Sequence, residues 1–228
     1  MRWISHRDLA RLWERMLRRA QFELSMTEGF HPKPRIGFPS ALALGVESRD
    51  EVVEIELSQD LSPQEVLARL EADQQPGLSI KRVSRLPEGF GKAALVRCDY
   101  TITMIDDADS SEVDSAIADL LSRSTVEIER KKKTVPIDLP SQILALERDD
   151  RNLRLTLAAS DSAALRPADV LDLLGFTDWI ENGSKIVREH VILRKDLVSD
   201  DPQTTAASNG DAVTTPLSLE TTETERDA

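Results

Sequence analysis

The sequence predicts an α+β protein built of two tandem ferredoxin-like (β-α-β-β-α-β) units, of which the first lacks its initial strand. Two helix starts, at Ser62 and Arg166, share the pattern Pro-x-acid-Val-Leu-x-x-Leu at an offset of 104 residues. Strands and helices alternate in a similar order around both. The segment 87–93 contains one proline and two glycines, a composition typical of a linker. We therefore expect units at residues 1–86 and 94–198.

In the first unit, apolar residues at helical spacing after Ser5 predict the first helix, and alternation of apolar and polar residues predicts strands. The helix that begins at Ser62 has a serine cap, a proline in its first turn and the capping-box residue Glu65. The expected elements are a helix at 6–21, a short strand at 35–39, a strand with Val53, Ile55 and Leu57 facing inward, the Ser62 helix and a strand at 78–83.

The second unit begins with an expected strand at 94–104 and a helix at 111–122 whose apolar residues share one side. Asp149-Asp150 marks the turn of a hairpin, and Gly175 ends the helix that begins at Pro167. The remaining strands are expected at 126–131, at 135–139, through Leu153, Leu155 and Leu157, and at 186–193.

The first unit has no counterpart of the strand at 94–104. Subtracting the repeat offset of 104 places that counterpart at about −10 to 0, before Met1. Only Arg2-Trp3-Ile4 remains to form it, and a usual strand has about five or six residues. We therefore expect an upstream start codon or an incomplete first sheet.

The net charge of −12 is distributed unevenly over the 228 residues. Residues 199–228 contain seven acidic side chains, one arginine and seven threonines. They have too little apolar surface to offset the entropy of ordering, so we expect a disordered, solubilising tail. No run of 18 apolar residues is present, and no membrane span is expected.

Cys98 is the only cysteine. A single thiol excludes an internal disulfide, a multi-cysteine zinc site and a cysteine-ligated iron–sulfur cluster. The three histidines, His6, His31 and His190, lack the spacing of a metal motif. We therefore expect a cytoplasmic protein with no metal or other cofactor.

Positive charge is concentrated at the N-terminus, where Met1–Arg35 has eight basic and four acidic residues. Four arginines of the expected first helix recur at i, i+4, i+8 and i+11, away from its apolar stripe: Arg7, Arg11, Arg15 and Arg18. Arginine can bind phosphate through two hydrogen bonds at once. The row predicts a surface for RNA or an acidic partner. The alternative is an ordinary solvated helix face.

The loop Gly29–Arg35 presents Phe30, His31, Lys33 and Arg35 on a backbone that Pro32 and Pro34 restrict. An aromatic ring beside cations on a stiff loop suits base stacking combined with phosphate contact. The alternative is a rigid connection in which Phe30 is buried as a plug. A second basic run, Arg130–Lys133, includes Lys131 and Lys132 and is either part of the same interface or a solvated hairpin.

Ser5-His6-Arg7-Asp8 offers a hydroxyl, an imidazole and a carboxylate within four residues. Ser5 and Asp8 have the spacing of a helix cap, and adjacent helical residues do not face one another, so a catalytic triad is disfavoured. His6 stays free of the cap. A second interpretation is therefore an RNA-processing enzyme that uses His6 and His31 as acid and base without a metal.

Several motifs resemble the radical SAM-linked protein family, whose members are fused to, or encoded beside, radical SAM proteins. The matching segments are Ser5-His6-x-Asp8-Leu9, Leu17-Arg18-Arg19-Ala20, Gly29-Phe30-His31-Pro32-x-Pro34-Arg35-Ile36, Leu42-x-Leu44-Gly45-Val46-Glu47-Ser48, Ile137-Asp138-Leu139, Leu153-x-Leu155, Arg166-Pro167-x-Asp169-Val170-Leu171 and Val187-Arg188. The likeness spans nearly all of residues 1–198. Arg7 stands where the pattern has leucine, and Leu139-Pro140 where a hydrophobic–arginine pair is expected.

The resemblance implies a radical SAM protein as partner and a domain of unknown function. It also assigns Ser5, Asp8, Gly29, Pro32, Gly45 and Glu47 to the family motif. A radical SAM catalyst needs a three-cysteine cluster motif, and this chain has one cysteine. We therefore expect a non-catalytic accessory protein that binds RNA, such as tRNA, or docks on the enzyme through its basic N-terminal face.

Overall fold

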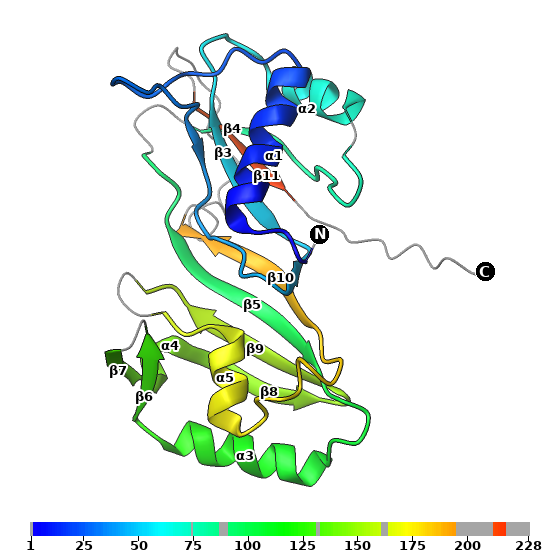
Figure 1. The fold of residues 1–228 in the computed structure, drawn as a ribbon, viewed down its shortest axis with the longest axis vertical. Coiled ribbons are helices and arrows are strands. Elements are labelled where there is room, and N and C mark those ends of the chain that lie inside the picture. The colour runs from blue at the N-terminus through cyan, green and yellow to red at the C-terminus, as the bar shows by residue number, and fades with distance from the viewer. Residues whose placement is uncertain are drawn as a thin grey trace, which may run out of the picture. The chain divides into compact units, whose positions relative to one another are not determined.

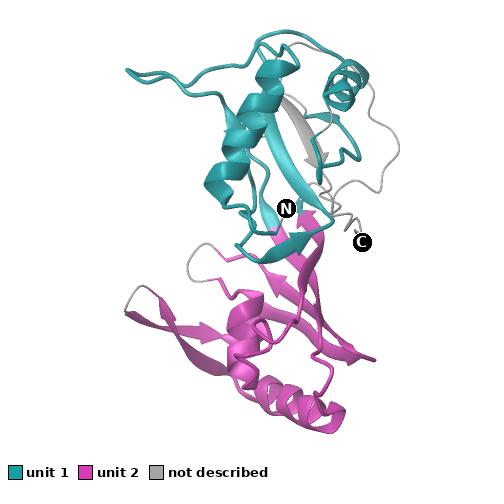
Figure 2. Ribbon diagram, turned by 45° about the vertical axis from the view of Figure 1, so that its right-hand side comes forward, with its two compact units in different colours: residues 1–95, 193–228 teal, residues 96–192 magenta. Residues whose placement is uncertain are grey.

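The computed structural model describes residues 2–73, 75–86, 91–130, 133–160, 164–194 and the strand 212–217 (Figure 1). It is a mixed α+β structure. The chain divides into two compact units, Met1–Leu95 with Leu193–Ala228 (unit 1) and Val96–Ile192 (unit 2), which Figure 2 distinguishes by colour. Among the described residues, no helix combines the length and the apolar character that crossing a membrane requires.

Unit 1 combines two helices with a four-stranded antiparallel sheet in the order β1-β3-β11-β4. Its elements are α1 (His6–Arg19), β1 (Ile36–Gly37), β2 (Val46–Ser48), β3 (Glu51–Glu56), α2 (Pro63–Ala72), β4 (Ser84–Leu86) and β11 (Ala212–Leu217). The two helices and the strand with Val53, Ile55 and Leu57 inward are as predicted from the sequence, and all three of those side chains are buried.

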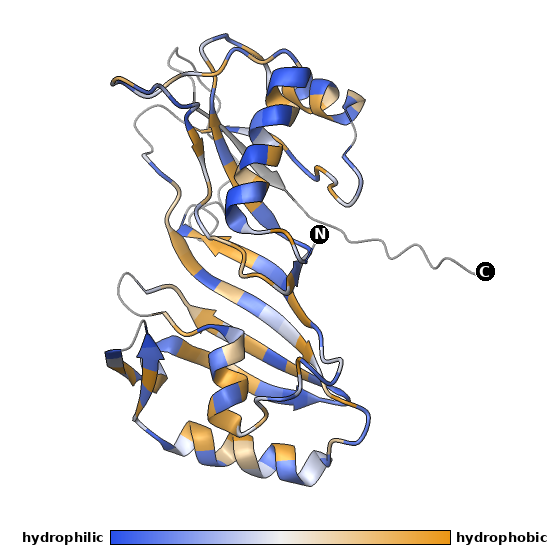
Figure 3. Cartoon of the chain, viewed as in Figure 1, coloured by the Kyte–Doolittle hydropathy of each residue, from blue (hydrophilic) through white to orange (hydrophobic). Residues whose placement is uncertain are grey.

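Helix α1 begins at its serine cap, where the Ser5 hydroxyl accepts the Asp8 backbone N–H at 3.2 Å. The predicted cap is therefore present, and it leaves the Ser5 hydroxyl bonded to Asp8, with its Oγ 2.7 Å from Oδ2. The helix ends at Arg19 because Gln21 takes a positive φ of 58°. One face packs into the core of unit 1, while the face seen in Figure 3 is largely hydrophilic. The buried residues are Leu9, Leu12, Trp13, Met16 and Leu17.

The last strand predicted for the first unit was misplaced by the sequence pattern. The expected strand at 78–83 is irregular chain after a turn in which the Leu78 N–H donates to the Gln75 carbonyl. Leu78 and Ile80 pack against the core without forming a ladder. The ladder begins only at Ser84, opposite β11. Apart from a single bridge at Ser79, the apolar alternation of this segment reflects packing on the core and not a continuous strand.

Strand β11 lies within the segment 199–228, for which the sequence predicted a disordered tail. Of that segment the structure describes Ala212–Leu217, which pair with β3 through all six residues and with β4 through three. The structure thus shows a strand at these six residues, and the rest of the predicted tail lies outside the described residues. Their sequence contains consecutive β-branched residues, Val213, Thr214 and Thr215, which favour strands once a partner is available.

Unit 2 has a sheet whose strands run in the order β10-β5-β9-β8, covered by helices. Its elements are β5 (Leu95–Thr103), α3 (Ser110–Ser122), β6 (Thr125–Arg130), β7 (Lys133–Asp138), α4 (Leu139–Gln142), β8 (Ile143–Asp149), β9 (Asn152–Ala158), α5 (Pro167–Leu174) and β10 (Ile186–Leu193). Strands β6 and β7 form a separate two-stranded sheet. The turn at Asp150, with φ 54°, and the left-handed cap Gly175 are where the sequence predicted them.

Helix α2 supplies a prediction about its cap. The Glu65 carboxylate accepts the Ser62 backbone N–H at 2.8 Å and the Ser62 hydroxyl at 2.7 Å, and these bonds lower the pKa of Glu65. Ser62→Ala should therefore raise the pKa of Glu65, measured by NMR titration, and lower the thermal midpoint by a few degrees.

The sign of the pH dependence follows from the depressed pKa of Glu65. The Glu65 carboxylate stabilises the folded state at pH values above the pKa that it has in the unfolded chain. This stabilisation is lost as the pH falls through the lower pKa that it has in the folded chain. The difference in thermal midpoint between wild type and Ser62→Ala should thus be larger at neutral pH than at acidic pH. Glu65→Gln is the control, since it keeps an acceptor and removes the titration; an equal pH dependence in that variant would contradict this account.

Candidate nucleic-acid interface

Residues 25–35, called here the finger, project from unit 1 as a narrow two-stranded loop (Figures 1 and 2). At its base the Ser25 N–H donates to the Glu56 carbonyl at 2.9 Å, and the Arg35 N–H donates to the Ser25 carbonyl at 2.9 Å. Further out, the Thr27 N–H donates to the Lys33 carbonyl at 2.8 Å. The finger is therefore an ordered extension of the backbone ladder beside β3.

The tip of the finger holds Phe30 in solvent, with 101% of its surface exposed. Gly29 precedes it with φ +124°, a conformation that side-chain-bearing residues rarely adopt. The alternative of Phe30 as a buried plug is therefore wrong. A wholly exposed phenylalanine forgoes roughly 1.5–3 kcal/mol of burial. A large apolar side chain in this position is typical of a contact surface for another molecule.

The basic residues of the finger differ in whether their side chains form hydrogen bonds or ion pairs within the protein. Arg35 donates to the Met26 carbonyl at 3.2 Å and pairs with Glu56 at 3.3 Å, so it ties the two sides of the base together. His31 and Lys33 are exposed, and within the described part of the chain their side chains have no polar partner. Pro32 lies between them and is exposed as well.

The arginine row of α1 is exposed along its length, but half of it is paired. Arg11 lies 3.4 Å from Asp8, and Arg18 lies 2.8 Å from Glu14. Arg7 and Arg15 have no ion pair to any residue that the structure describes. The predicted row thus presents two guanidinium groups without an acidic partner among the described residues. The other two could bind an anionic ligand only if it displaced their carboxylate partners.

Arg19, which follows the row, is engaged elsewhere. Its guanidinium Nε lies 3.0 Å from both carboxylate oxygens of Asp73, beyond the end of α2, and this hydrogen bonding raises the pKa of Arg19. The pair links the ends of the two helices. The separation of these residues in the chain gives no local signal, so sequence reasoning missed it.

The two candidate catalytic histidines are not brought together among the described contacts. His6 packs edge-on against the Phe38 ring, with centroids 5.1 Å apart. His31 is in the exposed finger, and no hydrogen bond or ring contact between described residues joins it to His6. Their acid–base pairing is thus without a geometric basis in the described residues. Nor do three or more His, Cys, Asp or Glu side chains gather there in a way that could hold a metal ion.

The motif residues Gly45 and Glu47 hold the N-terminal residues in place. The Gly45 N–H donates to the Arg2 carbonyl at 2.8 Å, and the Glu47 carboxylate pairs with the Arg2 guanidinium at 3.1 Å. The Trp3 ring lies 3.5 Å from where a side chain on Gly45 would begin. The φ of +86° favours glycine at position 45, whereas the distance to Trp3 is an ordinary van der Waals contact. Both motif residues therefore contact the N-terminal residues of the chain.

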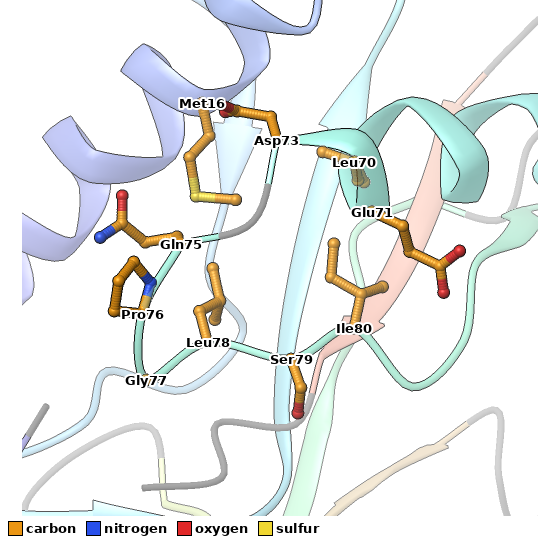
Figure 4. Close-up of a pocket in the computed structure, with 10 residues that line it drawn as sticks. All are labelled: Met16, Leu70, Glu71, Asp73, Gln75, Pro76, Gly77, Leu78, Ser79 and Ile80. Atoms are coloured by element: carbon orange, nitrogen blue, oxygen red, sulfur yellow. The ribbon is translucent and has the colours of Figure 1, made fainter. Parts of the chain in front are cut away.

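A pocket of about 600 Å³ lies between α1, α2 and the chain that follows α2. Figure 4 shows Met16, Leu70, Leu78 and Ile80 facing one another across it, with Glu71 turned away. Asp73 lines the rim. Its walls are largely apolar, the Asp73 carboxylate at its edge is paired with Arg19, and none of the sequence-predicted site residues lines it.

In the second basic run, Lys131 and Lys132 lie outside the described residues. Arg130 is committed to the fold, because its guanidinium pairs with Asp169, with Nη1 2.8 Å from Oδ1, and this hydrogen bonding raises the pKa of Arg130. Lys133 is exposed. The run therefore contributes fewer available cations than its sequence suggests.

Residues 1–167 match the model of a protein family described as "Uncharacterized protein conserved in bacteria (DUF2344)". Comparison with curated proteins and with solved structures gave no match. The description of the family names no activity, cofactor or partner, and nothing in it links the family to radical SAM proteins.

Proposed function

We propose that this chain, which belongs to the bacterial family DUF2344, is a non-catalytic RNA-binding protein whose contact surface is the finger together with the arginine row of α1. The observation that carries the proposal is the wholly exposed Phe30 at the tip of an ordered, cation-bearing hairpin. RNA is the ligand class that pairs these two features, since it offers unstacked bases and phosphates together.

The finger supports the base contact. Its ladder of backbone hydrogen bonds orders Phe30 before any ligand arrives, so less conformational entropy is lost on binding. A base can stack on an aromatic ring whatever its identity, and such a contact is worth roughly 1–3 kcal/mol. His31 and Lys33 follow Phe30 in the exposed part of the finger and supply cations for phosphate contacts beside a stacked base.

The helix supports the phosphate contacts. Arg7 and Arg15 are exposed, lack an acidic partner among the described residues and lie on one helix row. The finger follows α1 in the chain and extends from the end of unit 1 at which the helix ends (Figure 1). A single strand that stacks at the finger could thus continue toward the row.

Two finer assignments belong to the same proposal. The resemblance to radical SAM-linked proteins supports an accessory role in which this chain presents RNA to a radical SAM enzyme. The sheet orders support ferredoxin-like units: β10-β5-β9-β8 is the 4-1-3-2 order of that fold, and β1-β3-β11-β4 is its reverse with β11 in the first position.

The test is the binding of total tRNA and of an unstructured oligoribonucleotide at several salt concentrations. Phe30→Ala should weaken binding of the oligoribonucleotide by roughly 5- to 150-fold without changing the salt dependence, because a stacking contact releases no counterions. Arg7→Glu/Arg15→Glu should flatten the slope of log K against log salt by roughly 1.4 units, about 0.7 for each phosphate contact with a single strand.

The matched control is Arg82→Glu/Lys92→Glu, which makes the same change in net charge at two exposed cations of unit 1. It should leave most of the affinity intact. If the control weakens binding as much as the helix variant, the attraction is general and the proposed surface is wrong. Wild type without salt-dependent RNA binding would reject the RNA proposal, and docking on a protein partner would replace it.

A further inference from the structure

We propose that unit 1 contains a strand-binding slot between β3 and β4, and that β11 is the exchangeable strand that occupies it. The proposal is independent of RNA binding. It rests on the order of the strands, on their register and on what the slot would expose when empty.

The two walls of the slot pair with β11 and not with each other. Thr214 is opposite Glu54 of β3 on one side and opposite Ser84 of β4 on the other, and Val213 is opposite Ile55 and Arg85 in the same way. Without β11, the facing edges of β3 and β4 would each present unpaired N–H and C=O groups. A strand is the ligand that satisfies both edges at once.

Both walls of the slot carry apolar side chains that are shielded from water. Val53 and Ile55 of β3 are 1% and 2% exposed, and Leu86 of β4 is 6% exposed. They belong to a sheet against which α1 and α2 pack (Figure 1). Buried backbone groups without partners cost roughly 1–3 kcal/mol each, so an empty slot would be strongly disfavoured.

The resident strand is held unevenly, which is why we infer that it can leave. Six of its residues pair with β3, but only Ala212–Thr214 pair with β4. Pro216 lies opposite Val52 and has no N–H to donate. Main-chain pairing depends little on side-chain identity, so another extended segment could take the same place. Occupancy by β11 therefore controls whether the slot is open to such a segment.

The first test traps the register in the full-length chain. Thr214→Cys/Ser84→Cys joins two residues that lie opposite each other, and mild oxidation should link them within one chain. Thr214→Cys/Ser58→Cys is the mismatched control, since Ser58 lies beyond the end of β3. The native Cys98 is buried and should not compete. Equal linking of the two pairs would overturn the assigned register.

The second test measures exchange. A labelled peptide with the sequence of residues 210–219 should bind the reduced double-cysteine chain, and about tenfold or more weakly the oxidised one, whose tethered strand competes at high effective concentration. The same peptide with Thr214→Pro should bind poorly to both, because it lacks a central N–H donor. Equal binding to the locked and reduced chains would refute exchange in the slot.

Hydrogen exchange of backbone amides tests the same proposal in the wild-type chain, without cysteine substitutions. Backbone amides of Val53 and Ser84, which both face β11, should exchange with solvent slowly in the intact chain, and excess unlabelled peptide should not accelerate them, since a strand occupies the slot throughout. Fast exchange throughout β4 in the intact chain would show that β11 does not occupy the slot, and the proposal would be wrong.

Discussion

Replacing Trp13 with alanine should lower the free energy of unfolding by about 3–5 kcal/mol, the largest effect that we expect from a single substitution in unit 1. Trp13 is 1% exposed and lies at the centre of the buried face of α1. Its removal leaves a cavity between the helix and the sheet, and the surrounding side chains can collapse into it only in part. Urea denaturation at neutral pH measures the loss.

Trp3→Ala is the matched control for that experiment. It makes the same chemical change at a tryptophan that is 67% exposed and that contacts the Arg2 guanidinium at 4.8 Å from the ring centroid. We expect it to cost less than about 1 kcal/mol. If both variants were destabilised equally, Trp13 would not belong to the core as described.

Asp169→Ala should lower the free energy of unfolding by about 2–3 kcal/mol, because one carboxylate serves two elements of unit 2. It accepts the Arg166 backbone N–H at 2.7 Å, at the start of α5, and it pairs with Arg130 at the end of β6. The two side chains are 14% and 23% exposed, so the pair is largely desolvated. Without Asp169, the partners of the Arg130 guanidinium among the described residues would be the carbonyls of Ala164 and Glu129.

Asp172→Ala is the control for the second substitution, since Asp172 is an exposed aspartate one turn further along α5. It should change stability by no more than about 0.5 kcal/mol. Thermal unfolding of both variants makes the comparison. Similar losses would mean that net charge, and not the link between α5 and β6, sets the stability of this region.

The helices could be predicted from the sequence because their ends are local signals. Ser5 and Ser62 supply caps within three residues of their partners, and Gly175 supplies a left-handed end. Strand β4 could not be placed in the same way. Its position depends on where β11 meets it, and nothing near Ser84 reports that distant partner.

For the proposed contact surface, the sequence predicted which residues are exposed or charged but not how the chain arranges them. The arginine row lies on the exposed side of α1, and the ion pair of Arg18 with Glu14 follows from helical spacing. The sequence left Phe30 either buried or stacked, because exposure depends on whether the chain on both sides forms a projecting ladder. That ladder involves Glu56 of β3, far from the loop in the chain.

Strand β11 also sets the order in which the protein can mature during synthesis. Unit 2 is continuous in the chain, so it can fold once its last residue leaves the ribosome. Unit 1 must wait, because Ile55 emerges early and its partner Val213 emerges only after all of unit 2. At roughly 5–20 residues per second, the edges of β3 and β4 stay open for many seconds. A nascent chain therefore has an interval in which chaperones, or a strand from elsewhere, can reach the edges of unit 1.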